Sequence, residues 1–332
     1  MITRRGFGLG AATLGLAACS QTDTDDAPGE ITFCVPASGR LTRRQIDWRP
    51  LFADMEAATG LKVRPFLATS DAIQLDAMKH RRVDAGWFSN EAALAAVRSA
   101  DGEVFARTIP PSGGAGYRSV LIAASKGSVT LDRLGKCDRT LRYGQAAVTS
   151  TAGYLAPLAF FFGPNKLDPA KCFKLVSTGD IEANLAAVAG GTLDVAASDS
   201  ALLDRLTQAG DPRAAKLEVI WASPDLAEDP ILCRKNLDPE LKEKLRQFFI
   251  TDARGDTAGA QAQRDHLNPL DIGGFEPADN SHLLLAREIE ARVRWAQATW
   301  SGDAARIEAS RKAMDAIIAE RQAVQLAPGA AQ

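Results

Sequence analysis

The sequence has few of the features that point to catalysis. Its three histidines, His80, His266 and His282, all lie in polar or charged stretches. It contains no G-x-S-x-G, H-E-x-x-H or Walker A pattern, and no two cysteines are spaced as C-x-x-C. These absences remove the motif-based support for a hydrolase, a zinc site or a redox site. We therefore expect no enzyme, no metal and no other cofactor.

Basic charge and aromatic residues are also scarce. The formal net charge is -2 and aromatic residues make up 6% of the chain. Nucleic-acid-binding proteins usually carry a basic face, often with aromatic residues that stack on bases. We therefore expect no nucleic-acid partner. A mildly acidic chain can still bind a small anion, because a group of backbone amides is enough to hold one.

The N-terminus lacks an apolar run that is long enough for a membrane span. Arg4 and Arg5 precede the uncharged stretch Gly8–Ala18, which is too short to cross a bilayer as a helix. This pattern predicts a signal peptide over residues 1–19. The stretch Thr3–Phe7 resembles the twin-arginine export motif.

The end of this segment resembles a lipobox, the motif in which a cysteine is lipidated and becomes the mature N-terminus. The motif is Leu16-Ala17-Ala18-Cys19, and the polar residues 20–29 that follow resemble a flexible tether. We expect a protein of the periplasm or cell surface that Cys19 anchors to a membrane. The alternative is an ordinary N-terminal helix with an incidental cysteine.

Export places the remaining cysteines in an oxidising compartment. They are Cys34, Cys137, Cys172 and Cys233. Cys137 and Cys172 each precede a predicted strand, at 139–145 and 173–177. If those strands are neighbours, a disulfide is geometrically feasible. Four unrelated buried thiols are the alternative.

Short apolar runs alternate with segments of helical periodicity from Glu30 onward. This alternation predicts the α/β class with parallel strands. Two parts of it resemble each other: Asp71–His80 precedes Arg82–Ala85, and Ile181–Ala189 precedes Leu193–Ala196. The repeat predicts two similar lobes with a ligand cleft between the carboxyl ends of their strands. Chance similarity between common βαβ units is the alternative.

The predicted first lobe is discontinuous, with residues 30–123 and 221–280, and the second lobe spans 124–220. Two crossings, near 119–123 and 217–222, would join the lobes and suit hinge closure. Residues 281–326 are predicted to form C-terminal helices, because apolar residues such as Leu285, Ile289 and Val293 share one face. These helices either brace a lobe or form a homodimer contact.

Two short segments are candidates for ligand binding. Ser150, Thr151, Ala152 and Gly153 lie between a predicted strand and an apolar helix, where free N–H groups and the helix dipole favour an anion. Plain N-capping is the alternative. Asp229, at the return to the first lobe, could take a proton from an oxyanion or hold an ammonium group. An Asx-turn before a proline is its alternative role.

Four stretches together resemble the phosphonate-binding periplasmic proteins of ABC importers. They are Val83–Asn90, Gly116–Ile122, Ser150–Pro157 and Val219–Pro230. The resemblance implies a type II periplasmic binding fold, with two α/β lobes joined by two crossing strands. It also implies a phosphorus oxyanion as ligand and an ABC permease as partner.

The resemblance also assigns roles to single residues. The family holds the phosphonate oxygens with a Ser-Thr-Ser-Gly turn, which Ser150, Thr151 and Gly153 match, while Ala152 replaces the second serine. Asp229 matches the hinge aspartate of the family.

Other ligand positions depart from the family pattern. Asp71 and Phe88 stand where the family has tyrosines, and Ile181 stands where it has a histidine, or Asp180 does if one residue is inserted. Some members of the family have an acidic residue that holds an amino group of the ligand. Ala201 stands at that position in this chain, and Asp199 is a nearby acid that could substitute for it. Because a hydrogen bond to a charged group contributes about 1.5–3 kcal/mol, such losses predict a changed ligand preference.

We therefore expect a solute-binding lipoprotein of an importer that captures a phosphonate or a related phosphorus oxyanion. The alternatives are a receptor of the same fold for a different solute, a sensory lipoprotein and an exported enzyme. The enzyme has the least support, because the sequence shows no pairing of a nucleophile with a base.

Overall fold

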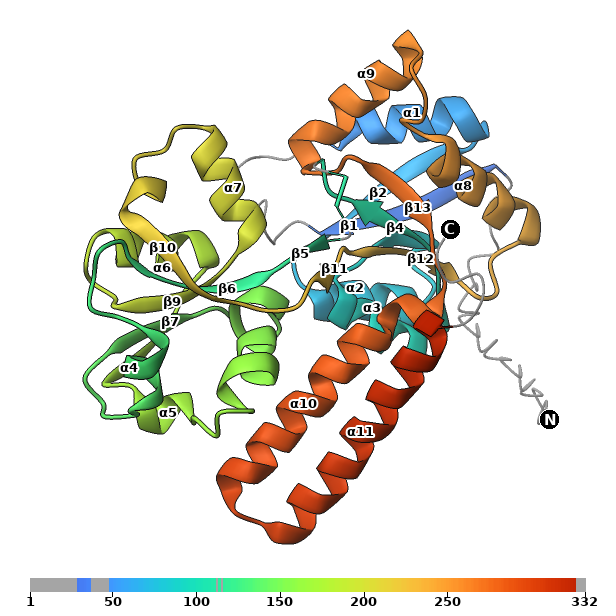
Figure 1. Ribbon diagram of the computed structural model, residues 1–332. Helices are drawn as coiled ribbons and strands as arrows, with labels where there is room; N and C mark the ends of the chain where they lie inside the picture. The colour runs from blue at the N-terminus through green and yellow to red at the C-terminus, as the bar shows by residue number, and fades with distance from the viewer. Residues whose placement is uncertain (1–28, 37–47, 112, 115, 327–332) are drawn as a thin grey trace, which may run out of the picture.

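The computed structural model describes residues 29–36, 48–111, 113–114, 116 and onward to 326. The signal peptide, the lipobox with Cys19 and nearly all of the tether lie outside the described residues, so these remain predictions. The described chain forms two α/β lobes and a projecting helical hairpin (Figure 1). The predicted α/β class is confirmed, but the prediction of parallel strands throughout is wrong, because both sheets also contain antiparallel pairs.

The first lobe contains a mixed sheet of six strands in the order β13-β4-β12-β3-β1-β2. β1 pairs in parallel with β2 and β3, whereas β4, β12 and β13 pair antiparallel. The strands are β1 (Glu30–Pro36), β2 (Lys62–Ala68), β3 (Ala85–Trp87), β4 (Gly102–Ile109), β12 (Pro230–Arg234) and β13 (Gly274–Pro277).

Helices cover both faces of this sheet, because alternate residues of its strands are apolar. Phe33 of β1 packs with the side that carries α1, α8 and α9, and Cys34 packs with the side that carries α2 and α3. These helices are α1 (Arg49–Thr59), α2 (Asp71–Lys79), α3 (Asn90–Ser99), α8 (Pro239–Thr251) and α9 (Ala258–Leu267), with short turns η4 (Asn268–Leu270) and η5 (Asn280–Leu283).

The second lobe contains a sheet of five strands in the order β10-β6-β9-β7-β8. It is also buried on both faces: Leu121 of β6 faces one core and Ile122 faces the other. The strands are β6 (Ser119–Ala124), β7 (Arg142–Gln145), β8 (Leu175–Thr178), β9 (Val195–Asp199) and β10 (Leu217–Ala222). The helices are α4 (Leu131–Gly135), η1 (Thr151–Leu155), η2 (Leu158–Phe162), α5 (Pro169–Cys172), α6 (Ile181–Ala189), α7 (Ser200–Gln208) and η3 (Ala214–Lys216).

A two-stranded ribbon, β5 (Gly116–Tyr117) with β11 (Leu226–Ala227), lies between the two sheets. The backbones approach closely there: a Cβ on Gly116 would lie 1.9 Å from the carbonyl oxygen of Leu226. β6 and β10, which the sequence placed at the crossings, pair with each other inside the second sheet. The boundary at residue 123 is therefore a few residues late, and the chain crosses between lobes nearer to the ribbon.

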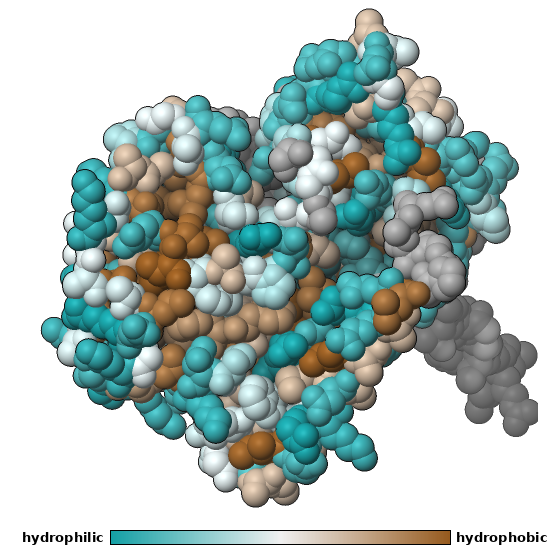
Figure 2. Space-filling model, in the orientation of Figure 1, coloured by the Kyte–Doolittle hydropathy of each residue, from teal (hydrophilic) through white to brown (hydrophobic). Residues whose placement is uncertain are grey.

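α10 (Leu284–Ser301) and α11 (Ala304–Leu326) form the C-terminal hairpin. α10 contacts both lobes: Ala286 packs with the first-lobe core, and Ile289 and Val293 pack with the second-lobe core. α11 lies along α10, where Arg321 binds the buried Glu288. The visible surface of the hairpin is largely hydrophilic with separate apolar spots (Figure 2). A homodimer through this hairpin remains a prediction.

Cys137 and Cys172 form a disulfide, with their Cα atoms 4.1 Å apart. The bond lies just before β7 and β8, which are parallel neighbours as the predicted pairing required. Cys34 and Cys233 are buried free thiols, and burial raises the pKa of each to about 12. The disulfide therefore links the segments that precede β7 and β8 in the second lobe. The other two cysteines belong to strands β1 and β12 of the first-lobe sheet.

Asp252 provides a test of the first-lobe packing. It is 2% exposed, and neither carboxylate oxygen has a hydrogen-bond partner among the described residues. Burial, with the nearby Asp54 carboxylate, raises its pKa from 3.8 to about 7. Its stabilising contribution is present below pH 4 and is lost as the pH rises towards 7. We expect Asp252→Asn to raise the free energy of unfolding at pH 8 by ~1–3 kcal/mol and to change it little at pH 4.

Urea denaturation at the two pH values measures this difference. The exposed Asp256→Asn is the matched control, because Asp256 lies in the adjacent loop at the surface. Equal effects of Asp252→Asn at both pH values would show that folding does not raise the pKa of Asp252.

Candidate functional site

The candidate site lies where the start of η1 in the second lobe meets the first lobe. η1 follows β7, and its N-cap is Ser150, whose Oγ accepts a hydrogen bond from the N–H of Gly153 at 3.1 Å. The turn is a π-helical one: the N–H groups of both Tyr154 and Leu155 donate to the Ser150 carbonyl. Single π-helical turns often occur at functional sites.

This helix start offers hydrogen-bond donors to a ligand. The first N–H groups of a helix have no acceptor within it, and Ser150 satisfies only that of Gly153. The N–H groups of Thr151 and Ala152 therefore point out of the helix end, where the dipole also favours an anion. The capping role and the anion-binding role of Ser150 are thus compatible.

Packing around Gly153 shapes the turn. A Cβ on Gly153 would lie 2.3 Å from the Cβ of Ala146 and 3.3 Å from Cγ1 of Ile181. Only glycine fits there, and Ile181, the first residue of α6, lies directly beside the turn. Ser119 of β6 donates from Oγ to the Ala152 carbonyl at 2.6 Å. The turn is thereby tied to the strand that leads out of the ribbon.

Two of the predicted acids lie at helix starts or strand starts of the first lobe. Asp71 is the first residue of α2, and Ser89 donates from Oγ to its Oδ2 at 3.2 Å. Asp229 directly precedes β12, and Asn90 donates from Nδ2 to its Oδ1 at 3.3 Å. The Asp229 carbonyl also accepts from the N–H of Thr108 at 3.0 Å. Burial raises the pKa of Asp71.

Glu91 is the residue that the sequence analysis missed. It is the second residue of α3, and both of its carboxylate oxygens lie 2.8 Å from Oγ1 of Thr151 in the other lobe. Burial, and then the charges of Asp229 and Asp71, raise its pKa from 4.5 to about 7, against the effect of the Thr151 hydrogen bond. Its position in the first turn after β3, beside the family-like stretch ending at Asn90, is the signal that could have identified it.

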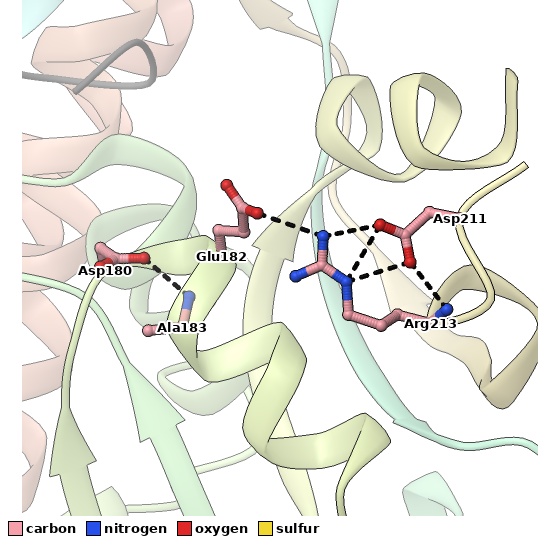
Figure 3. Close-up of polar contacts among 5 residues, drawn as sticks. All are labelled: Asp180, Glu182, Ala183, Asp211 and Arg213. Atoms are coloured by element: carbon pink, nitrogen blue, oxygen red, sulfur yellow. Dashed lines mark hydrogen bonds and ion pairs between the residues drawn. The ribbon is translucent and has the colours of Figure 1, made fainter. Parts of the chain in front are cut away.

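Three other predicted positions have structural contacts within their own lobe. Phe88 is fully buried in the first-lobe core. Asp199 is 1% exposed and caps α7 by accepting from the N–H of Leu202 at 2.6 Å. Asp180 caps α6 by accepting from the N–H of Ala183 at 2.7 Å (Figure 3). Asp180 and Asp199 each cap a helix, and a ligand role for Phe88 and Asp199 remains a prediction.

The remaining charges near α6 are already paired. Arg213 binds Asp211 and reaches Glu182 at 3.2 Å (Figure 3).

Within the described ranges, no group of three or more His, Cys, Asp or Glu residues is placed to hold a metal ion. The same part of the chain has no helix that is long and apolar enough to span a membrane. The site is therefore an amide-rich turn that faces three carboxyl groups.

Comparison with known proteins gives consistent matches. The family model described as "ABC transporter, phosphonate, periplasmic substrate-binding protein" matches residues 41–283. The chain is 36% identical over 204 residues to the phosphonates-binding periplasmic protein of Escherichia coli K12, covering 61% of this chain and 60% of that protein. It is 25% identical over 257 residues to a phosphate-import protein of Mycolicibacterium smegmatis, covering 74% of this chain and 78% of that protein.

Solved structures agree with these sequence matches. A binding protein component of an ABC phosphonate transporter from Pseudomonas aeruginosa has a TM-score of 0.74 and 32% identity, over 88% of this chain and 99% of that one. A Prochlorococcus marinus protein in complex with methylphosphonate has a TM-score of 0.66 and 15% identity, over 80% and 99% of the chains. The second match shows the fold alone. The predicted type II periplasmic binding fold is confirmed.

The fit around Gly153 leads to a prediction about the turn. Gly153→Ala forces the Ala146 methyl group or the turn itself to move, and overpacking of this kind costs about 1–3 kcal/mol. We expect a melting temperature lower by several degrees. Gly135→Ala is the matched control, because a Cβ there meets nothing within 4 Å. Thermal unfolding of both variants measures the difference, and equal melting temperatures would contradict the described packing.

Proposed function

The chain belongs to the family of periplasmic phosphonate-binding proteins of ABC transporters, and on this premise we propose that it captures a phosphonate or a related phosphorus oxyanion between its lobes and delivers it to a permease. The family is one of substrate-binding proteins and not a class of enzymes. The observation that carries the proposal is the turn at Ser150–Gly153, which keeps its capping serine, its free amides and its obligatory glycine.

The residues of the site have different roles in this proposal. The hydroxyl groups of Ser150 and Thr151 and the N–H groups of Thr151 and Ala152 hold the ligand oxygens, and the Ala152 amide compensates for its missing hydroxyl. Ile181, beside the turn, limits the space there. Asp229 takes a proton or an ammonium group from the first lobe. Phe88 and Asp199 are buried and affect the site indirectly: Phe88 packs in the core of the first lobe, and Asp199 caps α7.

The predicted leader adds a cellular location to the proposal: an exported protein that Cys19 anchors to a membrane. Relatives of this chain are periplasmic, and the Leu16–Cys19 motif supports a lipid anchor at Cys19. An anchored receptor remains near its permease, because residues 20–29 would tether the folded domain to the membrane.

A ligand screen tests the proposed function. Thermal unfolding is measured with methylphosphonate, phosphite, phosphate and sulfate, and we expect at least one phosphorus oxyanion to raise the melting temperature. Ser150→Ala removes a hydrogen bond to a charged ligand, which is worth about 1.5–3 kcal/mol, and should weaken binding by about 10- to 150-fold. Ser310→Ala on α11 is the control and should bind normally. If only a different class of solute stabilises the protein, the ligand assignment is wrong.

The anchor has its own test. Full-length protein and Cys19→Ser are expressed in a bacterium that processes lipoproteins, and the cells are fractionated. We expect the parent in the membrane fraction and the variant in the soluble fraction, because a variant without the acceptor thiol cannot be lipidated. An unchanged distribution would rule out anchoring through Cys19.

A further inference from the structure

Glu91 occupies the place at which an anion would approach the turn. Both of its oxygens lie 2.8 Å from the Thr151 hydroxyl group, which belongs to the opposite lobe and to the proposed oxyanion-holding set. A carboxylate is itself an anion with oxygen acceptors. Glu91 therefore satisfies, from within the protein, a donor that the proposed ligand also needs.

Helix stabilisation alone does not explain this geometry. Acidic residues are common in the first turn of a helix, because the positive end of the dipole stabilises their charge. Such an arrangement lowers the pKa of the acid. For Glu91 the pKa is instead raised to about 7, because the carboxyl group is buried and lies near the charges of Asp229 and Asp71.

Among the described residues, the charges that shift the pKa of Glu91 are negative. Asp71 faces it from the start of α2, and Asp229 faces it from the segment before β12, and both charges raise its pKa. The hydrogen bonds described above for these three acids come from neutral groups, namely the hydroxyl groups of Ser89 and Thr151 and the side-chain amide of Asn90. The nearest turn of the second lobe, η1, contributes no charged side chain. An oxyanion placed on the turn would thus be close to three carboxyl groups.

We propose that Glu91 selects the ligand: as a carboxylate it competes with an oxyanion for the turn at Ser150–Gly153, and it takes up a proton when an oxyanion binds and then donates a hydrogen bond to it. This inference rests on the proposed function and adds a residue to its site. The protonated carboxyl keeps a donor and removes the repulsion. An ionised Glu91 repels the ligand and keeps Thr151 engaged.

The proposal has a defined pH dependence. Below pH 7 Glu91 is largely protonated, so an oxyanion binds without an added cost. Above pH 7 one proton must be taken up for each oxyanion bound, so affinity falls by up to tenfold for each further pH unit. Glu91→Gln cannot ionise, so it lacks this component. The ligand's own titration is the same for both proteins and cancels in the comparison.

Isothermal titration calorimetry with methylphosphonate tests the proposal. The parent, Glu91→Gln and the remote control Glu240→Gln are titrated at pH 6 and pH 8.5, each in two buffers of different ionisation enthalpy. At pH 8.5 we expect the parent and the control to take up about one proton more than Glu91→Gln, and to bind about tenfold more weakly. At pH 6 the three affinities should lie within a few fold. Equal proton uptake by the parent and Glu91→Gln at pH 8.5 would overturn the role of Glu91.

Two further variants separate the remaining explanations. Glu91→Asp keeps the charge but shortens the side chain, so its carboxylate withdraws from Thr151 and should bind methylphosphonate at pH 8.5 more tightly than the parent. Asp71→Asn should retain the extra proton uptake, and its loss in this variant would assign the proton to Asp71 instead. If methylphosphonate, phosphite and phosphate bind to none of the proteins at either pH, the proposed function itself is wrong. If they bind with equal proton uptake, only the inference on Glu91 is wrong.

Discussion

The site depends on one constraint, which is the connection from each parallel strand to the helix that follows it. A helix that follows a parallel strand begins at the carboxyl edge of the sheet, so each lobe presents helix starts at one edge. In the second lobe that edge carries η1, which follows β7, and in the first lobe it carries α2 and α3, which follow β2 and β3. The ribbon at Gly116 and Leu226 holds the two lobes together. Free amides of one lobe therefore meet the helix starts of the other.

The same constraint accounts for the acidity of the first-lobe side. Acidic residues are favoured in the first turn of a helix, and Asp71 and Glu91 both occupy such positions. On an isolated lobe they would be ordinary helix-stabilising residues. In the folded protein both are partly buried, which makes their charges costly, and Glu91 also contacts Thr151 of the second lobe. A feature of local helix chemistry thereby becomes a condition on what the proposed site can bind.

Local patterns in the sequence were sufficient for several features. The hydroxyl and small residues from Ser150 to Gly153 precede an apolar helix, so the turn could be identified without a structure. Cys137 and Cys172 could be paired because each precedes a predicted strand. The alternation of apolar runs and helical segments predicted the α/β class, and the internal repeat predicted two lobes. The crossing regions were placed within a few residues of the ribbon.

Features that depend on long-range contacts could not be predicted in this way. β6 is apolar on both faces, so its pattern did not show to which sheet it belongs. Glu91 resembles any acid of a first helical turn until the opposite Thr151 is in place. The burial of Phe88 and the capping role of Asp199 depend on how the helices pack around them. The contact between Glu91 and Thr151 exists only because the two lobes lie together.

The most direct test of the central claim is a crystal structure of the mature protein with methylphosphonate. We expect the phosphonate oxygens to lie within hydrogen-bond distance of Ser150 Oγ and of the Thr151 and Ala152 N–H groups, with the ligand between the two lobes. A phosphonate bound elsewhere, with no contact to this turn, would show that the turn does not hold the ligand.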